Sequence, residues 1–394
     1  MLFFETNKVM DACIAPFSYH LLGSQGRDTE GVMTFFGKLK KMVNIFSPAK
    51  TAREEGVGKI EPGERVRGRP RVHVLATGGT IAGRLVSTGP RYRAGVLGVE
   101  ALLDAVPALR GLADLSGEQI ANIGSQDMDE TIWLKLAHRV NELVAHSDVD
   151  GVVITHGTDT LEETACFLDL TVRSPKPVVL VGAVRPAGAL GADGAINLLD
   201  AVSVAASPGA VGRGVLVVMH GALFEARDVS KVSISAMSAF AAPNSGPLGQ
   251  LIDGRIYFGH RTGLSLDRPV FDVSRLDKLP PVGIVYGHVG ASALPVKSMV
   301  DAGCRGIVTA GVGSGNLHHD MLAALADASG RGVVVVRASR VPSGLTLRNM
   351  EVDDNRFGFV AAGSLNPQKA RALLQLALTR TRKPEEVQKV FDGY

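Results

Sequence analysis

The chain has 394 residues, of which 45 % are hydrophobic and 46 are glycine, a composition that excludes collagen-like, coiled-coil and wholly disordered proteins. Residues 1–70 hold 11 of its 42 Lys and Arg and 8 of its 39 Asp and Glu, which leaves 31 of each sign in residues 71–394. The net charge of +3 therefore belongs to the first 70 residues, and the neutral remainder predicts no nucleic-acid surface and no membrane-binding basic helix.

Residues 1–70 show neither strand alternation nor a long capped helix, so we expect a disordered extension. A short amphipathic helix around residues 33–46 is the alternative, and the basic stretch of residues 59–70 has the composition of a linker or tail. Polar and charged residues interrupt the apolar segment that a signal peptide needs, which predicts none. No run approaches the roughly 18 apolar residues of a membrane span.

From residue 71 onward, short β-branched runs alternate with helical periodicity. Strands are expected at residues 72–76, 151–155, 178–181, 214–219, 282–286, 306–309 and 332–337. Helices are expected at residues 99–105, 129–146, 161–170, 194–206, 293–302, 320–328 and 367–379. This alternation predicts an α/β fold in which helices cover both faces of a parallel sheet.

The domain organisation follows from one irregular segment. Residues 271–281 end in two prolines ahead of a new strand and are the best linker candidate. We therefore expect a larger N-terminal parallel-sheet α/β domain at residues 71–270 and a smaller C-terminal α/β domain at residues 282–394. The many glycines follow no repeat, so they are expected at turns and at close approaches of the backbone.

The loop after the first expected strand reads T-G-G-T-I-A-G at residues 77–83. Ligands of parallel sheets bind at the carboxyl ends of strands, where such loops gather. Two glycines there let the backbone approach a ligand beside the hydroxyls of Thr77 and Thr80. A merely tight or phosphate-cradling turn is the alternative, although the loop has neither P-loop nor dinucleotide spacing.

The loop after residues 151–155 reads H-G-T-D-T. Thr158 and Asp159 are expected at a strand-to-helix corner, where outward-facing N–H groups can stabilise an oxyanion. Thr160 and Glu163 fit a capping box. His156 is a possible general base, but its place at a strand end favours a buried, hydrogen-bonded histidine.

Three further features are ambiguous when taken alone. Residues 125–127 are either a polar loop or a set of donors and acceptors for an amino-acid head group. Lys231 is a solvated charge unless it activates a hydroxyl nucleophile. Cys13, Cys166 and Cys304 lie far apart, which argues against a disulfide scaffold and a cysteine zinc site, and no metal ligands are expected.

In their order, these motifs resemble the bacterial L-asparaginase family, specifically its type II branch. T-G-G-T-I-A-G is followed by G-S-Q-D, H-G-T-D-T-L-E-E-T, G-A-V-R-P, A-D-G-A-I-N-L and A-R-D-V-S-K. The resemblance continues through G-V-G-S-G-N-L, S-R-V-P, E-V-D-D and L-N-P-Q-K-A-R, and it covers about residues 71–394.

The resemblance implies hydrolysis of the side-chain amide of L-asparagine, with weaker action on L-glutamine, through a threonine acyl-enzyme and without a cofactor. By motif, Thr80 is the primary nucleophile and Tyr92 is its hydroxyl partner on a mobile lid. Thr158, Asp159 and Lys231 form a second catalytic cluster, in which the lysine favours deprotonation of the threonine or of a water.

The resemblance also implies the binding residues. Ser125 and Gln126, with Asp159, hold the α-carboxylate and α-ammonium of the substrate. Asn316 and Glu351 complete the site of a neighbouring subunit in a homotetramer built as a dimer of dimers. Donors for the tetrahedral intermediate are expected at the backbone N–H groups around Thr158 and Ala183.

Alternatives remain open at this point. A broader glutaminase-asparaginase is one, although Gln126 favours asparagine; a non-catalytic amino-acid sensor and an amidase acting on aminoacylated RNA are others. The lid, about residues 84–95, is one residue short of the family pattern, which leaves Tyr92 open. His220-Gly221 and Gly191 also depart from that pattern. The resemblance favours the periplasm, whereas the N-terminus favours the cytoplasm, so the compartment stays open.

Overall fold

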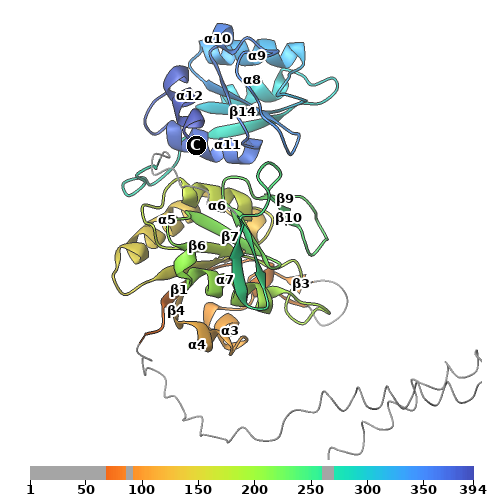
Figure 1. Ribbon diagram of the computed structural model, residues 1–394. Coiled ribbons are helices and arrows are strands. Elements are labelled where there is room, and N and C mark those ends of the chain that lie inside the picture. The colour runs from red at the N-terminus through yellow and green to blue at the C-terminus, as the bar shows by residue number, and fades with distance from the viewer. Residues whose placement is uncertain (1–67, 86–91, 260–269) are drawn as a thin grey trace, which may run out of the picture. The chain divides into compact units, whose positions relative to one another are not determined.

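Two large sheets with helices packed on them account for most of this computed structural model, which describes residues 68–85, 92–259 and 270–394 (Figure 1). The extension expected at residues 1–70 lies outside these residues except for residues 68–70, and so does the middle of the expected lid, residues 86–91. In the described part of the chain, no helix combines the length and apolar character needed to cross a membrane.

Within the described ranges, the larger sheet has eight strands in the order β12-β11-β8-β7-β6-β5-β1-β4. They are β1 (Arg71–Gly78), β4 (Asp114–Ile123), β5 (Gly151–Thr155), β6 (Val178–Val181), β7 (Val215–Met219), β8 (Ala222–Glu225), β11 (Gly249–Ile252) and β12 (Arg255–Phe258). Strands β4, β1, β5, β6 and β7 run parallel, whereas β8, β11 and β12 are antiparallel. The expected parallel sheet is therefore confirmed and extended by an antiparallel edge.

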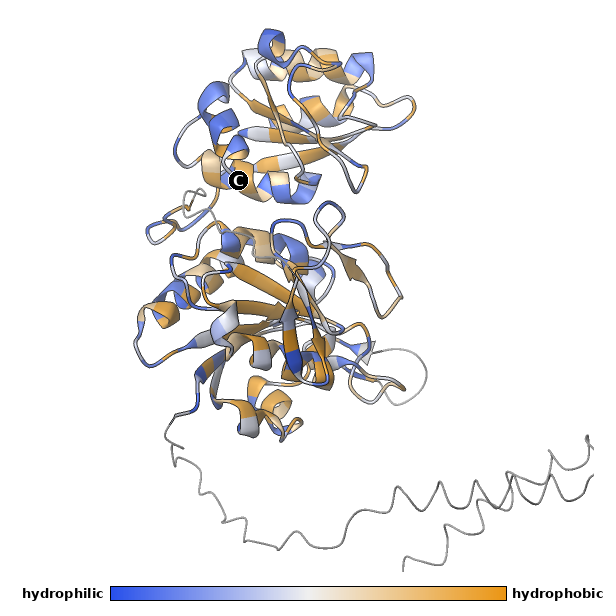
Figure 2. Cartoon of the chain, viewed as in Figure 1, coloured by the Kyte–Doolittle hydropathy of each residue, from blue (hydrophilic) through white to orange (hydrophobic). Residues whose placement is uncertain are grey.

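Helices cover both faces of this sheet. They are α3 (Val99–Asp104), α4 (Leu109–Leu112), α5 (Glu130–Ala145), α6 (Leu161–Asp169) and α7 (Gly194–Ala205). Successive side chains of a strand point to opposite faces, so Val152 and Ile154 of β5 pack into the core under α5 and α6, whereas Val153 packs into the core under α7. Figure 2 shows the central strands of this sheet mainly in orange, and β5, β6 and β7 are buried on both faces.

The smaller sheet is wholly parallel, in the order β13-β14-β15-β16. Its strands are β13 (Val282–Tyr286), β14 (Gly306–Gly311), β15 (Val334–Ser339) and β16 (Phe359–Ala361). Its helices are α8 (Leu294–Asp301), α9 (His319–Gly330), α10 (Asp354–Phe357), α11 (Pro367–Ala377) and α12 (Pro384–Asp392). This is the smaller C-terminal α/β domain that was expected. The boundaries at residues 270 and 282 stay predictions, and the described residues between them hold no helix or strand.

Short elements bring functional loops into place. They are β2 (Arg84–Leu85), β3 (Tyr92–Arg93), β9 (Ser230–Lys231), β10 (Phe240–Ala241) and the 3-10 turns η2 (Thr80–Ala82), η3 (Ser125–Asp127) and η4 (Pro208–Ala210). Strand β2 pairs with β3, and β9 pairs with β10.

The strands that were not predicted have identifiable causes. Strand β4 is an edge strand with several polar, exposed residues, so it shows no apolar run. The hairpin from β11 to β12 turns at Asp253-Gly254, both with positive φ, and this Asp-Gly pair was a usable hairpin signal. One departure from the family pattern lies in a turn of the same kind, because His220-Gly221, with φ of 52° and 71°, forms the two-residue turn between β7 and β8.

Candidate active site

The loops after β1 and β5 meet backbone to backbone. A Cβ atom at Gly79 would lie 2.3 Å from the main-chain nitrogen of Gly157, and Gly79 has a φ of 77°, so the position requires glycine. The Gly79 N–H donates to Ile123 O at 2.8 Å, which ties the same loop to β4. Thr80 follows in η2 with 8 % of its surface exposed. The glycines expected at close approaches thus bring the two threonine loops together.

Thr158, Asp159 and Lys231 form one cluster. The Lys231 Nζ donates to Thr158 Oγ1 at 3.0 Å and to Asp159 Oδ1 at 2.5 Å. Thr158 is 7 % exposed, whereas the Asp159 side chain is mostly exposed and the lysine is largely covered. An ammonium beside a hydroxyl favours the deprotonated oxygen. Lys231 is therefore not the solvated charge that a loop lysine is by default.

Ser125 joins this cluster from η3. Its Oγ accepts from the Asp159 N–H at 3.1 Å, and a Cβ at Gly157 would lie 2.6 Å from that oxygen. Gln126 is exposed, and its Nε2 donates to Asp127 Oδ2 at 3.1 Å. The structure thus brings a serine hydroxyl, an amide and the Asp159 carboxylate to the carboxyl ends of the parallel strands, and their role in binding a head group stays a prediction.

The capping box at Thr160 and Glu163 was a wrong prediction. The Thr160 hydroxyl donates to Ser125 O at 2.7 Å and makes no cap to the first turn of α6. Its hydroxyl faces another loop of the sheet edge, a contact that local sequence does not reveal. Thr160 keeps a structural role, because it holds the Ser125 loop against the Thr158 loop.

His156 is the buried, hydrogen-bonded histidine that was expected. It is fully buried, with Nδ1 2.7 Å from Gly157 O and Nε2 2.9 Å from Thr164 Oγ1. Nδ1 carries the proton because a carbonyl oxygen only accepts, so Nε2 accepts from the threonine. Trp133 Nε1 donates to the same Thr164 oxygen at 2.9 Å. Burial lowers the pKa of His156 to about 4, which keeps the ring neutral at neutral pH.

Ala183 lies close to the Thr80 loop, whereas Tyr92 lies in the strand that pairs with β2, which follows that loop. Ala183 is buried after β6, and a Cβ at Gly194 would touch both Ile81 Cγ1, at 3.3 Å, and Ala183 Cβ, at 3.6 Å. Tyr92 lies in β3, opposite Leu85 of β2. The role of Tyr92 stays a prediction.

Asn316 and Glu351 lie in the C-terminal domain and contact each other. The Asn316 Nδ2 donates to a carboxylate oxygen of Glu351, and the buried Asn316 Oδ1 has no hydrogen-bond partner among the described residues. Among the residues that the structure describes, no hydrogen bond or ion pair connects this pair with Thr158, Asp159 or Lys231. The chain by itself therefore separates the expected site residues into a threonine–lysine cluster and an asparagine–glutamate pair.

Comparison with known proteins identifies the family to which this arrangement belongs. Residues 71–262 match the family described as asparaginase, N-terminal, and residues 281–391 match the glutaminase/asparaginase C-terminal domain. L-asparaginase 2 of Escherichia coli (strain K12) is 52 % identical over 328 residues, which are 82 % of this chain and 93 % of that protein. The chain belongs to the asparaginase family. The resemblance inferred from the sequence, including the type II branch and an amidohydrolase activity, is confirmed.

Two further asparaginase relatives show the breadth of the match. L-asparaginase 2 of Bacillus subtilis (strain 168) is 44 % identical over 351 residues, which are 88 % of this chain and 92 % of that protein. Glutaminase-asparaginase of Pseudomonas fluorescens biotype A is 42 % identical over 328 residues, which are 82 % of this chain and 90 % of that protein.

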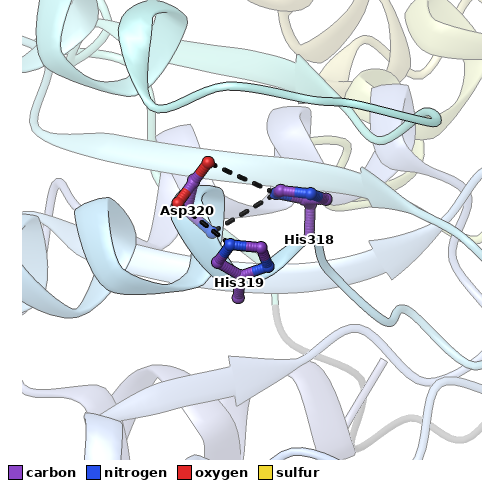
Figure 3. Close-up of side chains that lie close together, drawn as sticks. All are labelled: His318, His319 and Asp320. Atoms are coloured by element: carbon purple, nitrogen blue, oxygen red, sulfur yellow. Dashed lines mark hydrogen bonds and ion pairs between the residues drawn. The ribbon is translucent and has the colours of Figure 1, made fainter.

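One group of potential metal ligands occurs in the described part of this asparaginase, and it lies away from the threonine loops in sequence. Figure 3 shows His318, His319 and Asp320, whose potential ligand atoms lie within 4.8 Å of one another. His318 Nδ1 accepts from the Asp320 N–H at 3.4 Å, and His319 Nε2 lies 3.3 Å from the Asp320 carboxylate. The His318 side chain is the N-cap of α9, and His319 and Asp320 are the first two residues of that helix.

The unfolding free energy of this asparaginase should decrease when the pH is lowered, because of His156. The unfolded histidine titrates near pH 6.5 and the folded one near 4, so between these values only the unfolded chain binds the proton. Acidification through this window should therefore cost about 3 kcal/mol of unfolding free energy. Urea unfolding from pH 4.5 to 7, at one protein concentration, should show a flatter dependence in His156→Asn than in the wild type. The matched change at the exposed His146, His146→Asn, should keep the wild-type slope; equal slopes in all three proteins would contradict the assignment.

Glu162 was not predicted as a functional residue. It lies in the first turn of α6, one turn after Thr158, and its buried carboxylate accepts from the Lys231 main-chain N–H. Glutamates are common in the first turn of a helix, where their charge interacts favourably with the helix dipole. Apart from the position of Glu162 close to the threonine motif, the sequence therefore gave no signal for this residue.

Proposed function

We propose that this chain is an L-asparagine amidohydrolase that releases L-aspartate and ammonia. The observation that carries the proposal is the lysine ammonium placed 3.0 Å from Thr158 Oγ1 and 2.5 Å from Asp159. A protein that only senses an amino acid has no need of an activated hydroxyl. The neighbouring Thr80 loop supplies a second hydroxyl on the same sheet edge.

In the proposed reaction, Thr80 Oγ attacks the side-chain amide carbon and its proton passes to the departing nitrogen, which leaves as ammonia. Water then adds to the acyl-enzyme; its hydroxyl forms the new carboxylate of aspartate and its proton returns to Thr80. Lys231 stabilises the deprotonated oxygen of Thr158, or of the attacking water, during these transfers. Backbone N–H groups near Thr158 and Ala183 are the proposed donors to the tetrahedral oxyanion.

The proposed substrate is a free amino acid, because the site offers partners for both of its charged groups. The exposed carboxylate of Asp159 matches an α-ammonium, and Ser125 with Gln126 supplies donors for an α-carboxylate. A substrate with a blocked amine offers no α-ammonium to the Asp159 carboxylate, so we expect strong discrimination against it.

We also infer a homotetramer in which Asn316 and Glu351 serve the active site of another subunit. In the described part of the chain, the side chains of this pair hydrogen-bond to each other, and the buried Asn316 Oδ1 has no partner there. Three apolar side chains are almost fully exposed in the single chain, namely Leu190, Ile234 and Val289. Exposed apolar surface of this kind is typical of protein–protein interfaces. Light scattering of the full chain should give the mass of four subunits.

The activity is tested by ammonia release from L-asparagine, L-glutamine and N-acetyl-L-asparagine under identical conditions. We expect the largest kcat/KM with L-asparagine and at least a hundredfold smaller value for the acetylated compound. Comparable kcat/KM values for L-asparagine and L-glutamine would favour a glutaminase-asparaginase. Several relatives carry that name. No release from either free amino acid would refute the enzyme and favour the sensor.

A further inference from the structure

A buried carboxylate links the proposed catalytic lysine to the C-terminal domain. Glu162 is 4 % exposed, and its Oε2 accepts from the Lys231 N–H at 2.5 Å. Its Oε1 accepts from Asn366 Nδ2 at 3.0 Å and from Gln368 Nε2 at 2.6 Å. An ionised carboxylate has only acceptor atoms, so three N–H donors around it form a fully complementary set. Asn366 and Gln368 belong to the L-N-P-Q-K-A-R motif, whose role the sequence left unassigned.

The first turn of α11 also holds the segment that leads into Lys231. Asn366 Nδ2 donates to Ser230 Oγ at 3.1 Å. Lys369 Nζ donates to Arg227 O at 2.9 Å and also to Val229 O. Lys369 is itself buried, so its charge compensates that of Glu162 in the same region. The start of α11 therefore binds Arg227, Val229 and Ser230, which lead into Lys231.

The orientation of the Asn366 amide in this network is fixed. Asn366 is the N-cap of α11, and its Oδ1 accepts from the Lys369 N–H at 3.0 Å. The other end of the amide, Nδ2, is therefore the end that faces Glu162. A glutamine at position 162 would place an NH₂ group against at least one of the three donors, and the network has no alternative amide flip with which to absorb it.

We propose that Glu162 and the first turn of α11 are positioning residues that hold the Lys231 ammonium on Thr158. Strand β9 has only two residues, and among the described residues it pairs with the equally short β10 alone, so this two-stranded sheet fixes Lys231 weakly. The Glu162 contact fixes the main-chain nitrogen of Lys231, which is bonded to the Cα atom that carries the side chain. The inference rests on the proposed function of Lys231, and it assigns part of the catalytic geometry to the C-terminal domain.

A matched pair on α11 separates positioning from general stabilisation. Gln368 and Gln375 both donate from Nε2 to a carboxylate of the N-terminal domain: Gln368 to Glu162 at 2.6 Å, and Gln375 to Glu130 at 3.1 Å. Only the first carboxylate contacts Lys231. Removing either amide costs a hydrogen bond between the same helix and the same domain, but only Gln368 belongs to the network around the lysine.

The experiment measures kcat and KM for L-asparagine together with thermal stability. We expect Glu162→Gln to lower kcat about a hundredfold and Gln368→Ala about tenfold, with KM within about threefold of the wild type. Gln375→Ala should lower the melting temperature at least as much as Gln368→Ala while kcat stays within twofold. Equal losses of kcat in the two alanine variants, or none in Gln368→Ala, would overturn the proposal. If Glu162→Gln does not fold, the glutamine pair decides alone.

A second measurement does not depend on activity. Hydrogen exchange of the peptide that contains Lys231 should be at least about tenfold faster at this amide in Glu162→Gln and Gln368→Ala, and unchanged in Gln375→Ala. Unchanged exchange in both of the first two variants would overturn the proposal even if their activity fell. An inactive wild type would refute the proposed function alone, and the exchange rates would still decide whether Glu162 and α11 fix Lys231.

Discussion

Thr80→Ala is expected to lower kcat for L-asparagine by about 10⁴-fold or more, because no acyl-enzyme can form without the attacking hydroxyl. The small side chain follows Gly79 in a loop whose backbone is held by Ile123 and packed on Gly157, so alanine should be accommodated without loss of the fold. Single-turnover assays with mass spectrometry should detect an acyl adduct on the wild type and none on Thr80→Ala. Thr80→Ser, which retains the hydroxyl, should recover a substantial part of kcat.

Thr77 provides the matched control within the same loop. Its buried hydroxyl donates to Thr155 O at 2.9 Å, which is a structural contact between β1 and β5. Thr77→Ala should lower the unfolding free energy by about 1 kcal/mol and leave kcat within about tenfold of the wild type. Full activity of Thr80→Ala would remove Thr80 from the nucleophile role, and an acyl adduct found on Thr158 would then reassign that role.

Lys231→Met should lower kcat by about 10³-fold, the second largest effect that we expect. The substitution keeps much of the side-chain length but removes the ammonium that lies 3.0 Å from Thr158 Oγ1, and with it the charge that favours proton removal. The neighbouring Asp159 carboxylate is mostly exposed, so water can solvate it once its partner is gone, and the fold should persist. Circular dichroism and steady-state kinetics on the same samples check both parts.

The control for Lys231→Met is Lys135→Met. Lys135 Nζ donates to Ile120 O at 2.9 Å, so this variant also removes a charge and a hydrogen bond, but from helix α5 rather than from the cluster. Its kcat should stay within about twofold of the wild type. A Lys231→Met enzyme that retained more than a tenth of wild-type kcat would show that Thr158 needs no adjacent cation.

The sequence alone was sufficient to predict which loops meet at the site. Strand β5 is a five-residue apolar run buried on both faces, a pattern that predicts a central parallel strand. Parallel neighbours have their carboxyl ends at one edge, so the loops after β1 and β5 had to meet there, and the glycine pairs allowed their close contact. The order of the motifs then indicated the family that the comparisons confirm.

Tertiary structure alone decided the contacts between segments distant in the chain. The hydroxyl of Thr160 satisfies a carbonyl 35 residues away instead of capping its own helix, and the Glu162 carboxylate meets an amide 204 residues away. Strand β4 is polar because it lies at an edge, which no local pattern states. Hydrophobic periodicity is a local property, and it determines which face of an element is buried. The hydrogen-bond partner of a buried polar atom is instead determined by which segments the packed fold brings within about 3 Å of it.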